Sequence, residues 1–251
     1  MSITIHQFRC LSDNYGFLVR DDATGRVAAI DTPDAATYER ELEALGWGLD
    51  LILNTHWHPD HAGGNSALKA RYGAQVVAPA EVARLSPIDR EIAHGDIVSL
   101  GDTRFEVIDT GGHTQGHVSF HDAADAVVFV GDTLFTLGCG RMFEGTPSQF
   151  WASLGRLAAL PEETRLFCAH EYTASNLRFA RTVDPGEALA RRGVLLEARI
   201  AAGMPTVPTT IGEEKATNPF LRAPALALAS GTDDPAEAFG IVRGAKDMFK
   251  G

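Results

Sequence analysis

The heptapeptide Thr55-His56-Trp57-His58-Pro59-Asp60-His61 places three imidazoles and a carboxylate close together in the chain. It follows the apolar segment 49–54, which is typical of a buried strand. The whole protein has only nine histidines, so three in one short run is not the distribution of an ordinary surface loop. Imidazole nitrogens and carboxylate oxygens are ligands for zinc, iron and manganese. The run therefore predicts a metal site at the end of that strand.

The spacing within the run predicts how these ligands point. His56 and His58 are two residues apart, so an extended backbone directs both side chains the same way. Pro59 favours the extended conformation at His58 and also favours a turn. That turn lets Asp60 and His61 face a second point in space. The run offers four ligands, whereas a single ion would need about three from the protein.

Three more candidate ligands follow later predicted strands. His113 comes after the strand at 104–108, Asp132 after 126–130, and His170 after 165–168. Each one alone is typical of an ordinary loop or turn. Together they place every candidate ligand at the C-terminal end of a strand, where loops usually carry functional sites. His117, His121 and Cys139 are expected to be structural, the last because no activating partner is identifiable.

These residues must be positioned by short strands with a few helices between them. Strands are predicted at 3–8, 16–20, 26–30, 49–54, 75–78, 104–108, 118–120, 126–130 and 165–168. Helices are predicted at 34–45, 66–72, 149–160, 174–183 and 187–202, with a last one starting at Asp234-Pro235. The order indicates sheets with flanking helices, an α/β fold rather than a regular doubly wound array. After His170 the chain becomes helical, so we expect a catalytic domain at 1–170 and a second domain at 171–251.

Composition excludes several classes of protein. The chain is 45% hydrophobic and 22% charged, as in an ordinary globular protein, and its formal net charge is −11. That charge argues against a nucleic-acid partner. Acidic and basic residues balance in 171–251, so the negative charge lies in 1–170. Three cysteines are too few for a disulfide framework, and no apolar run could span a membrane, so a cytoplasmic location with no membrane partner is expected. Serine-hydrolase and nucleotide-binding motifs are absent from the sequence.

The metal-ligand run resembles the Thr-His-x-His-x-Asp-His signature of the metallo-β-lactamase superfamily. Further segments resemble the glyoxalase II family within it, the hydroxyacylglutathione hydrolases. These segments are 10–15, 131–135, Gly138-Cys139-Gly140-Arg141, Ala169-His170-Glu171-Tyr172-Thr173, Asn218-Pro219-Phe220-Leu221-Arg222 and 243–249. The Gly-Cys-Gly-Arg run and the C-terminal Arg-x-x-Lys favour this family over others in the superfamily. The resemblance extends from about residue 10 to about residue 249.

The resemblance implies an αββα sandwich followed by a helical, substrate-binding domain. It also implies two divalent ions per chain, with zinc expected and iron or manganese as alternatives. One ion would be held by His56, His58 and His113 and the other by Asp60, His61 and His170, with Asp132 bridging both. Asp132, Asp60 and His56 are the residues expected to act in catalysis. A metal-activated water would then attack a thioester carbonyl.

The implied substrate is an S-(2-hydroxyacyl)glutathione, typically S-D-lactoylglutathione, which is hydrolysed to glutathione and D-lactate in the second step of methylglyoxal detoxification. The family's substrate contacts fall here on Arg141, Phe143, Tyr172, Arg243 and Lys246. Arg141 and Phe143 depart from the usual lysine and tyrosine, so affinity for substrate is expected to differ. Arg243 and Lys246 are three residues apart on the last predicted helix, with Lys250 expected on the same face.

Other functions remain open on the sequence. A glutathione persulfide dioxygenase would use one iron on the same scaffold, and a non-catalytic metal-binding protein would use the same ligands. A β-lactam hydrolase or a tRNA-processing nuclease fits less well, the nuclease because of the acidic charge. The protein is expected to be a monomer. Its expected partner is a small molecule, a glutathione thioester.

Overall fold

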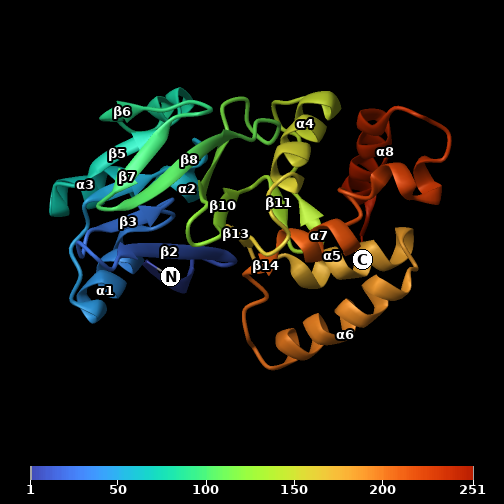
Figure 1. Ribbon diagram of the computed structural model, residues 1–251, viewed down its shortest axis with the longest axis horizontal. Coiled ribbons are helices and arrows are strands. Elements are labelled where there is room, and N and C mark those ends of the chain that lie inside the picture. Colours follow the sequence, from blue (N-terminus) through green and yellow to red (C-terminus); the bar gives the residue numbers. More distant parts are fainter. Residues whose placement is uncertain (1, 251) are drawn as a thin grey trace. The chain divides into compact units, whose positions relative to one another are not determined.

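The computed structural model describes residues 2–250, which form two compact units (Figure 1). The first unit contains the chain as far as Asp109 together with 114–131, and the second contains 110–113 and the chain from Asp132 onward. Strands and helices alternate through most of the chain, so the predicted α/β class is confirmed. None of the helices within 2–250 is long and apolar enough to cross a membrane.

A six-stranded mixed sheet forms one layer of the first unit. The second strand is antiparallel to both the first and the third, and the remaining strands run parallel to the third. In spatial order the strands are β1 (Ile3–Cys10), β2 (Asn14–Asp21), β3 (Val27–Ile30), β4 (Leu51–Leu53), β5 (Gln75–Ala78) and β6 (Arg90–Glu91). Because β3, β4 and β5 are parallel, their carboxyl ends lie at one edge of the sheet, and the metal-ligand run begins there.

Helices cover one face of this sheet. They are α1 (Ala35–Leu45), α3 (Asn65–Tyr72) and the 3₁₀ turn η1 (Ala80–Arg84). Asp34 caps α1 as the sequence predicts, since its carboxylate accepts a hydrogen bond from the Thr37 amide. Tyr38 and Leu42 of α1 are completely buried, in a cluster that also contains Leu18 and Ile52 of the sheet. Burial of this apolar face fixes the sheet whose edge carries the ligands.

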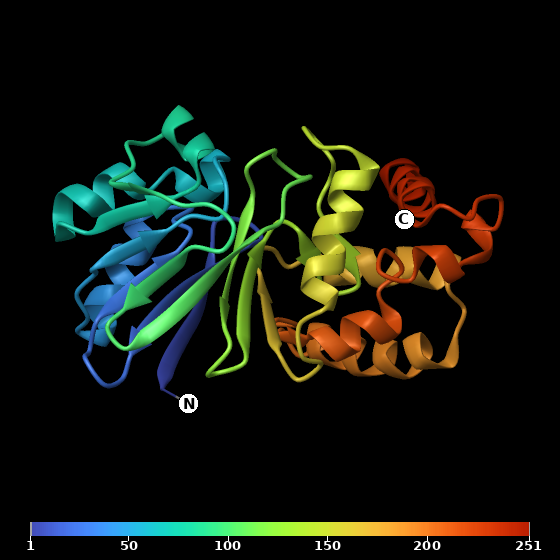
Figure 2. The ribbon, with the colours of Figure 1, turned by 45° about the horizontal axis from the view of Figure 1, so that its top comes forward.

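A second layer of the first unit is an antiparallel meander. Its strands are β7 (Ile97–Leu100), β8 (Thr103–Asp109), β9 (Val118–Asp122) and β10 (Val127–Gly131). Phe129 of β10 contacts Phe17 of β2 with ring centroids 5.5 Å apart, and Phe105 of β8 lies 6.4 Å from Phe129. These aromatic contacts join the meander to the opposite face of the first sheet, and Figure 2 shows the layers. Side chains alternate between faces, so Phe17 points to the meander while Leu18 points to the helices.

The second unit is mainly helical. Its elements are β11 (Leu134–Phe135), β12 (Gly138–Cys139), α4 (Pro147–Ala158), β13 (Arg165–Cys168), α5 (Thr173–Val183), α6 (Glu187–Ala201), β14 (Thr209–Thr210), α7 (Ile211–Thr217), η2 (Ala223–Ala225), η3 (Ala227–Ala229) and α8 (Pro235–Met248). Helices α4 and α8 lie side by side (Figure 1), with the rings of Phe150 and Phe239 stacked at 5.4 Å. Phe220 packs against Phe239 and completes this aromatic core.

Most predicted elements are confirmed to within a few residues, and the differences concern short ones. The structure adds the single helical turn α2 (Pro59–Ala62), the strands β6, β7, β11, β12 and β14, helix α7 and the 3₁₀ turns η1 to η3, none of which was predicted. Helix α8 ends at Met248, so the expectation that Lys250 shares its basic face is wrong. The division of function between 1–170 and 171–251 stays a prediction.

Candidate functional site

The first unit presents the metal-ligand run directly after β4. His58 has an extended backbone (φ −60°, ψ 147°), as the sequence predicts, and Pro59 then opens the helical turn α2 at its first position. His56 and His61 are completely buried, and the His56 ring stacks on His117 with centroids 4.8 Å apart. Two of the three imidazoles of the run therefore lie in the core rather than in a solvated loop.

Hydrogen bonds determine which nitrogen each buried imidazole presents. Asp31 accepts from His61 Nδ1 at 2.8 Å, so His61 keeps the lone pair on Nε2. Thr55 Oγ1 donates to Asp31 Oδ2 at 2.8 Å and lies 3.0 Å from His56 Nδ1. Since the hydroxyl proton is already used, His56 Nδ1 must donate, and its Nε2 also keeps a lone pair. That Nε2 lies 3.0 Å from His58 Nδ1.

Asp31 supports the run, and the sequence reasoning did not single it out. Its carboxylate accepts from the Thr55 amide and hydroxyl and from His61, and it is 4% exposed. Its backbone is in the left-handed region (φ 55°), which costs energy for a residue other than glycine. The only available signal was an acidic residue at the end of the predicted strand 26–30.

The second unit holds the other three predicted ligands, with the two histidines on either side of the Asp132 carboxylate. Asp132 Oδ2 lies 3.4 Å from His113 Nε2, and Asp132 Oδ1 lies 3.3 Å from His170 Nε2. All three side chains are buried, with Asp132 7% exposed. Each oxygen of the carboxylate thus faces a different imidazole, so Asp132 lies within reach of both histidines.

His113 has its tautomer fixed in the same way as His61. Its Nδ1 donates to the Arg141 carbonyl at 2.9 Å, so Nε2 carries the lone pair and points toward Asp132. The donor set fits divalent metals, because neutral imidazoles and carboxylates are the ligands that zinc, iron and manganese take. All seven predicted ligands belong to groups of His and Asp side chains that could hold a metal ion.

Gly112 sets the approach to His113, and its replacement should be costly. The residue has φ 142°, and a Cβ there would lie 2.5 Å from the buried Phe150 ring. Gly112→Ala should combine backbone strain with overpacking, each costing about 1–3 kcal/mol. The melting temperature should fall by roughly 5–15 °C, and bound metal should fall with it, as thermal unfolding and elemental analysis would measure. Gly155→Ala is the matched control, because a Cβ at Gly155 on α4 meets nothing within 4 Å; an equal loss in both variants would contradict this account.

Aromatic rings lie beside the ligands of the second unit. Tyr172 stacks parallel to His170 with centroids 4.8 Å apart and is 38% exposed. Phe135 packs edge-on against Tyr172 at 5.4 Å. Phe143 packs against His113 at 5.2 Å while 61% of it stays exposed. These two exposed rings provide apolar surface next to His113 and His170, where a substrate could pack.

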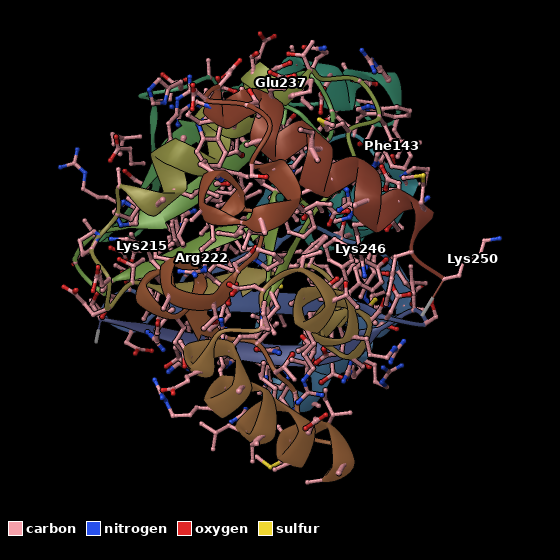
Figure 3. The ribbon with its side chains drawn as sticks, turned by 90° about the vertical axis from the view of Figure 1, so that its right-hand side faces the viewer. Phe143, Lys215, Arg222, Glu237, Lys246 and Lys250 are labelled. Atoms are coloured by element: carbon pink, nitrogen blue, oxygen red, sulfur yellow. The ribbon has the colours of Figure 1, made fainter. Side chains whose placement is uncertain are left out.

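Basic side chains of the second unit gather around Lys246. Lys246 Nζ donates to the Ser175 carbonyl and hydroxyl at 3.1 and 3.0 Å. Burial, together with the charges of Arg243, Arg178 and Arg141, lowers the pKa of Lys246 to about 8. Arg178 of α5 was not expected in this cluster. Lys250 extends outward beyond the end of α8 (Figure 3) and takes no part in it.

Arg243 is not part of a solvated basic face, because it is only 4% exposed. Its guanidinium donates to the Cys139 carbonyl and to Asp247, both at 2.9 Å, and lies over the Phe220 ring. Burial raises the pKa of the Cys139 thiol to about 11, although Arg243 opposes the shift. Cys139 is therefore a protonated thiol at neutral pH, in keeping with a structural role rather than that of a nucleophile.

Comparison with known proteins matches both parts of the chain. Residues 14–170 match the family described as the metallo-beta-lactamase superfamily, and residues 171–249 match the one described as hydroxyacylglutathione hydrolase C-terminus. Among solved structures, ETHE1 from Myxococcus xanthus is 28% identical with a TM-score of 0.73, over 98% of this chain and 92% of that one.

Two relatives match over nearly their whole length. The chain is 54% identical over 250 residues to a hydroxyacylglutathione hydrolase of Erythrobacter litoralis, covering 98% of this chain and 100% of the relative. It is 52% identical over 253 residues to a hydroxyacylglutathione hydrolase of Maricaulis maris, covering 98% and 99%. The chain therefore belongs to the hydroxyacylglutathione hydrolase family of the metallo-β-lactamase superfamily.

Proposed function

We propose that the protein hydrolyses S-(2-hydroxyacyl)glutathione thioesters, with S-D-lactoylglutathione giving glutathione and D-lactate in the second step of methylglyoxal detoxification. The observation that carries this proposal is the full-length identity of 54% to a protein named hydroxyacylglutathione hydrolase. The match of residues 171–249 to the C-terminal family of the same name supports 171–251 as the substrate-binding domain. Three free, buried cysteines support a cytoplasmic location.

The seven candidate ligands would hold two divalent ions, and zinc is the metal that we expect. His56, His58 and His113 would bind one ion, Asp60, His61 and His170 the other, and Asp132 both. When bound, two such ions acidify a shared water and polarise the thioester carbonyl. The chain supports this at three of the five histidines, because Asp31, Thr55 and the Arg141 carbonyl engage Nδ1 of His61, His56 and His113 and leave Nε2 as the ligand atom.

The second unit would bind the anionic glutathione part. Lys246 and Arg141 supply positive charge, and Arg243 joins them in our proposal although its guanidinium already binds the Cys139 carbonyl. Tyr172 and Phe143 would flank the thioester with their exposed ring faces. Arg141 in place of lysine keeps the charge in a planar, forked form, whereas Phe143 in place of tyrosine removes one hydroxyl contact.

Kinetics on two substrates would test the proposal. Wild-type protein should hydrolyse S-D-lactoylglutathione far faster than a small acyl thioester that lacks glutathione, because the glutathione contacts would be lost. Oxygen consumption with glutathione persulfide should be absent. Oxygen uptake without thioester hydrolysis would instead favour the one-iron dioxygenase, and stoichiometric metal with neither activity would favour a non-catalytic metal-binding protein.

The pKa of Lys246 predicts a KM that rises in alkali. Below pH 8 the ammonium is charged and can hold a carboxylate, and above that pH it becomes neutral. A charge-assisted hydrogen bond contributes about 1.5–3 kcal/mol, so KM for S-D-lactoylglutathione should rise roughly tenfold or more between pH 7 and 9.5, with kcat changing little. Lys246→Arg should flatten the profile, because arginine stays charged throughout. The same rise in Lys246→Arg would assign the effect to another group.

A further inference from the structure

The hairpin formed by β11 and β12 is held by side chains from three helices of the second unit. Four side chains do this, and all of them are at most 5% exposed: Asn176 of α5, Glu214 of α7, Asn218 at the end of α7, and Arg243 of α8. We call these four residues the cradle. Each makes at least one hydrogen bond to the hairpin's main chain.

The cradle contacts five consecutive residues of the hairpin. Asn218 Nδ2 donates to the carbonyls of Phe135 and Gly138, at 3.1 and 2.9 Å. Asn176 Nδ2 donates to the Thr136 carbonyl at 3.1 Å, and Glu214 accepts from the Leu137 amide at 2.9 Å. Arg243 donates to the Cys139 carbonyl. A hairpin this short has few ladder bonds of its own, so the cradle sets its position.

The turn of the hairpin has a strained backbone. Leu137 has φ 57°, which is unfavourable for a residue with a Cβ, and its side chain is buried in a cluster with Leu177, Leu189 and Leu196. A Cβ on Gly138 would lie 2.2 Å from the Asn176 amide, so no larger residue fits there. Such a conformation persists only where its surroundings hold it, which is what the cradle and this cluster do.

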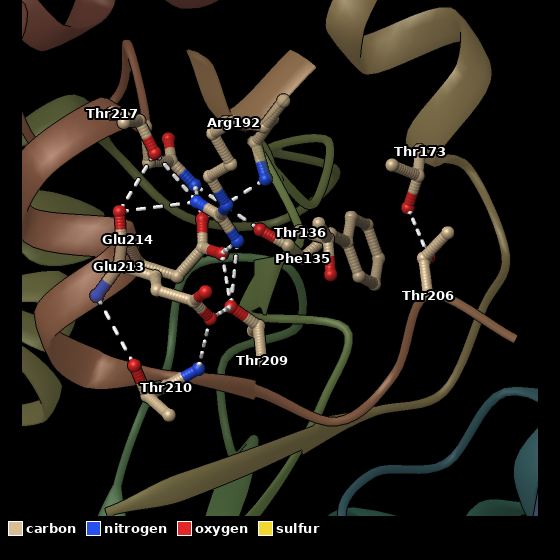
Figure 4. A network of polar contacts seen from close by, with 12 residues as sticks. Phe135, Thr136, Thr173, Arg192, Thr206, Thr209, Thr210, Glu213, Glu214 and Thr217 are labelled. Atoms are coloured by element: carbon tan, nitrogen blue, oxygen red, sulfur yellow. Dashed lines mark hydrogen bonds and ion pairs between the residues drawn. The ribbon is translucent and has the colours of Figure 1, made fainter. Parts of the chain in front are cut away.

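The cradle is itself anchored by a buried ion pair. Arg192 of α6 pairs with Glu214 and also donates to Thr217 and Thr209 (Figure 4). Glu214 is completely buried, and the pairing offsets the cost of burying its charge. Helices α5 to α8 therefore act on the hairpin through a polar network rather than through apolar packing alone.

The hairpin connects two parts of the candidate site. Asp132 lies two residues before Leu134, the first residue of the hairpin, and Gly140 and Arg141 follow it. Gly140 packs so closely that a Cβ there would lie 2.0 Å from the Asp132 carbonyl oxygen and 3.1 Å from His113 Nδ1. The Arg141 carbonyl accepts from His113 Nδ1. A shift of the hairpin would therefore move the Arg141 carbonyl away from His113 and change the setting of Asp132.

We infer that Asn176, Glu214 and Asn218 are positioning residues that couple the C-terminal helices to the candidate metal ligands His113 and Asp132 through the 134–139 hairpin. The inference rests on the proposed function for its kinetic consequences, but not for its effect on metal binding. The helical segment would then do more than bind substrate. Through the hairpin, its helices would also fix the position of the Arg141 carbonyl and thereby the tautomer and placement of His113.

Asn176→Ala and Asn218→Ala test the inference, with Thr217→Val as matched control. Thr217 belongs to the same network, but its hydroxyl bonds to Arg192 and to the Glu213 carbonyl rather than to the hairpin, so its loss should cost stability without moving the hairpin. Residues that orient metal ligands through hydrogen bonds typically contribute about 10–100-fold to metal affinity or to activity. Asn218→Ala, which removes two hairpin bonds, should weaken zinc binding and lower kcat by about that factor. Asn176→Ala should do so by less, and Thr217→Val should leave both unchanged.

Chelator competition for zinc, steady-state kinetics on S-D-lactoylglutathione and thermal unfolding of all four proteins separate the outcomes. Lower melting temperatures with wild-type zinc affinity and kcat in both asparagine variants would overturn the inference and leave the hairpin bonds merely structural. If Asn218→Ala does not fold, Asn176→Ala alone decides. If zinc binding weakens as expected but wild-type protein hydrolyses no glutathione thioester, the inference stands and the proposed function fails.

Discussion

Asp132→Ala should abolish stable binding of both metal ions and lower kcat for S-D-lactoylglutathione by about a thousandfold or more, since several kcal/mol of transition-state stabilisation depend on the metals. The reason is geometric: Asp132 Oδ1 and Oδ2 face His170 and His113 separately, so one substitution removes a ligand from each set.

Elemental analysis after dialysis, together with single-substrate kinetics, measures the effect. Asp184→Ala is the matched control, because Asp184 is also a buried carboxylate of the second unit but pairs with Arg222 instead. The control should keep its metal and its kcat even if its stability falls. Two ions retained with near wild-type turnover in Asp132→Ala would contradict the bridging role.

Acid should remove metal and activity together between pH 7 and 5. Five of the seven proposed ligands are histidines, which bind metal only as neutral imidazoles. Free imidazole takes up a proton near pH 6.5, so protons compete increasingly for the ligands as pH falls through that region, and both metal content and activity should fall more than tenfold. Because several protons compete for each ion, the loss should be steeper than a single titration.

Dialysis at each pH, elemental analysis and an assay after return to pH 7 would follow this loss. Excess zinc should shift the midpoint to lower pH and restore activity on return, since mass action favours the bound state. Acid inactivation with both metals still bound would point to a different titrating group. An unchanged midpoint in excess zinc would indicate that acid unfolding, rather than ligand protonation, limits activity.

The sequence predicted the extended backbone at His58 within the metal-ligand run because that conformation depends on local residues. Strand β4 is an apolar run, Pro59 dictates the backbone on both sides of itself, and the two-residue spacing of His56 and His58 needs no knowledge of distant residues. The starts of capped helices were predicted equally well, since Asp34 and Asp234 are the N-caps of α1 and α8 in the structure. The Thr210–Glu213 capping box was also present in the sequence, but the seven-residue helix α7 that it starts was overlooked.

The features that the sequence did not predict depend on residues that are distant in the chain but adjacent in the fold. Asp31 supports His61 only because β3 and β4 end side by side. The burial of Arg243 depends on Phe220 and on the Cys139 carbonyl, both remote in the chain, so its spacing on the helix could not indicate it. Strands of two residues such as β14 form only because β13 offers a partner, and nothing in their own composition marks them.

Stepwise addition of zinc to metal-depleted protein, with hydrolysis of S-D-lactoylglutathione followed at each step, tests the central claim that this chain is a binuclear thioester hydrolase. The account predicts that activity rises with added zinc and reaches its plateau at two equivalents per chain. A plateau at one equivalent would contradict the binuclear centre, and no hydrolysis at saturating zinc would contradict the assignment of the reaction itself.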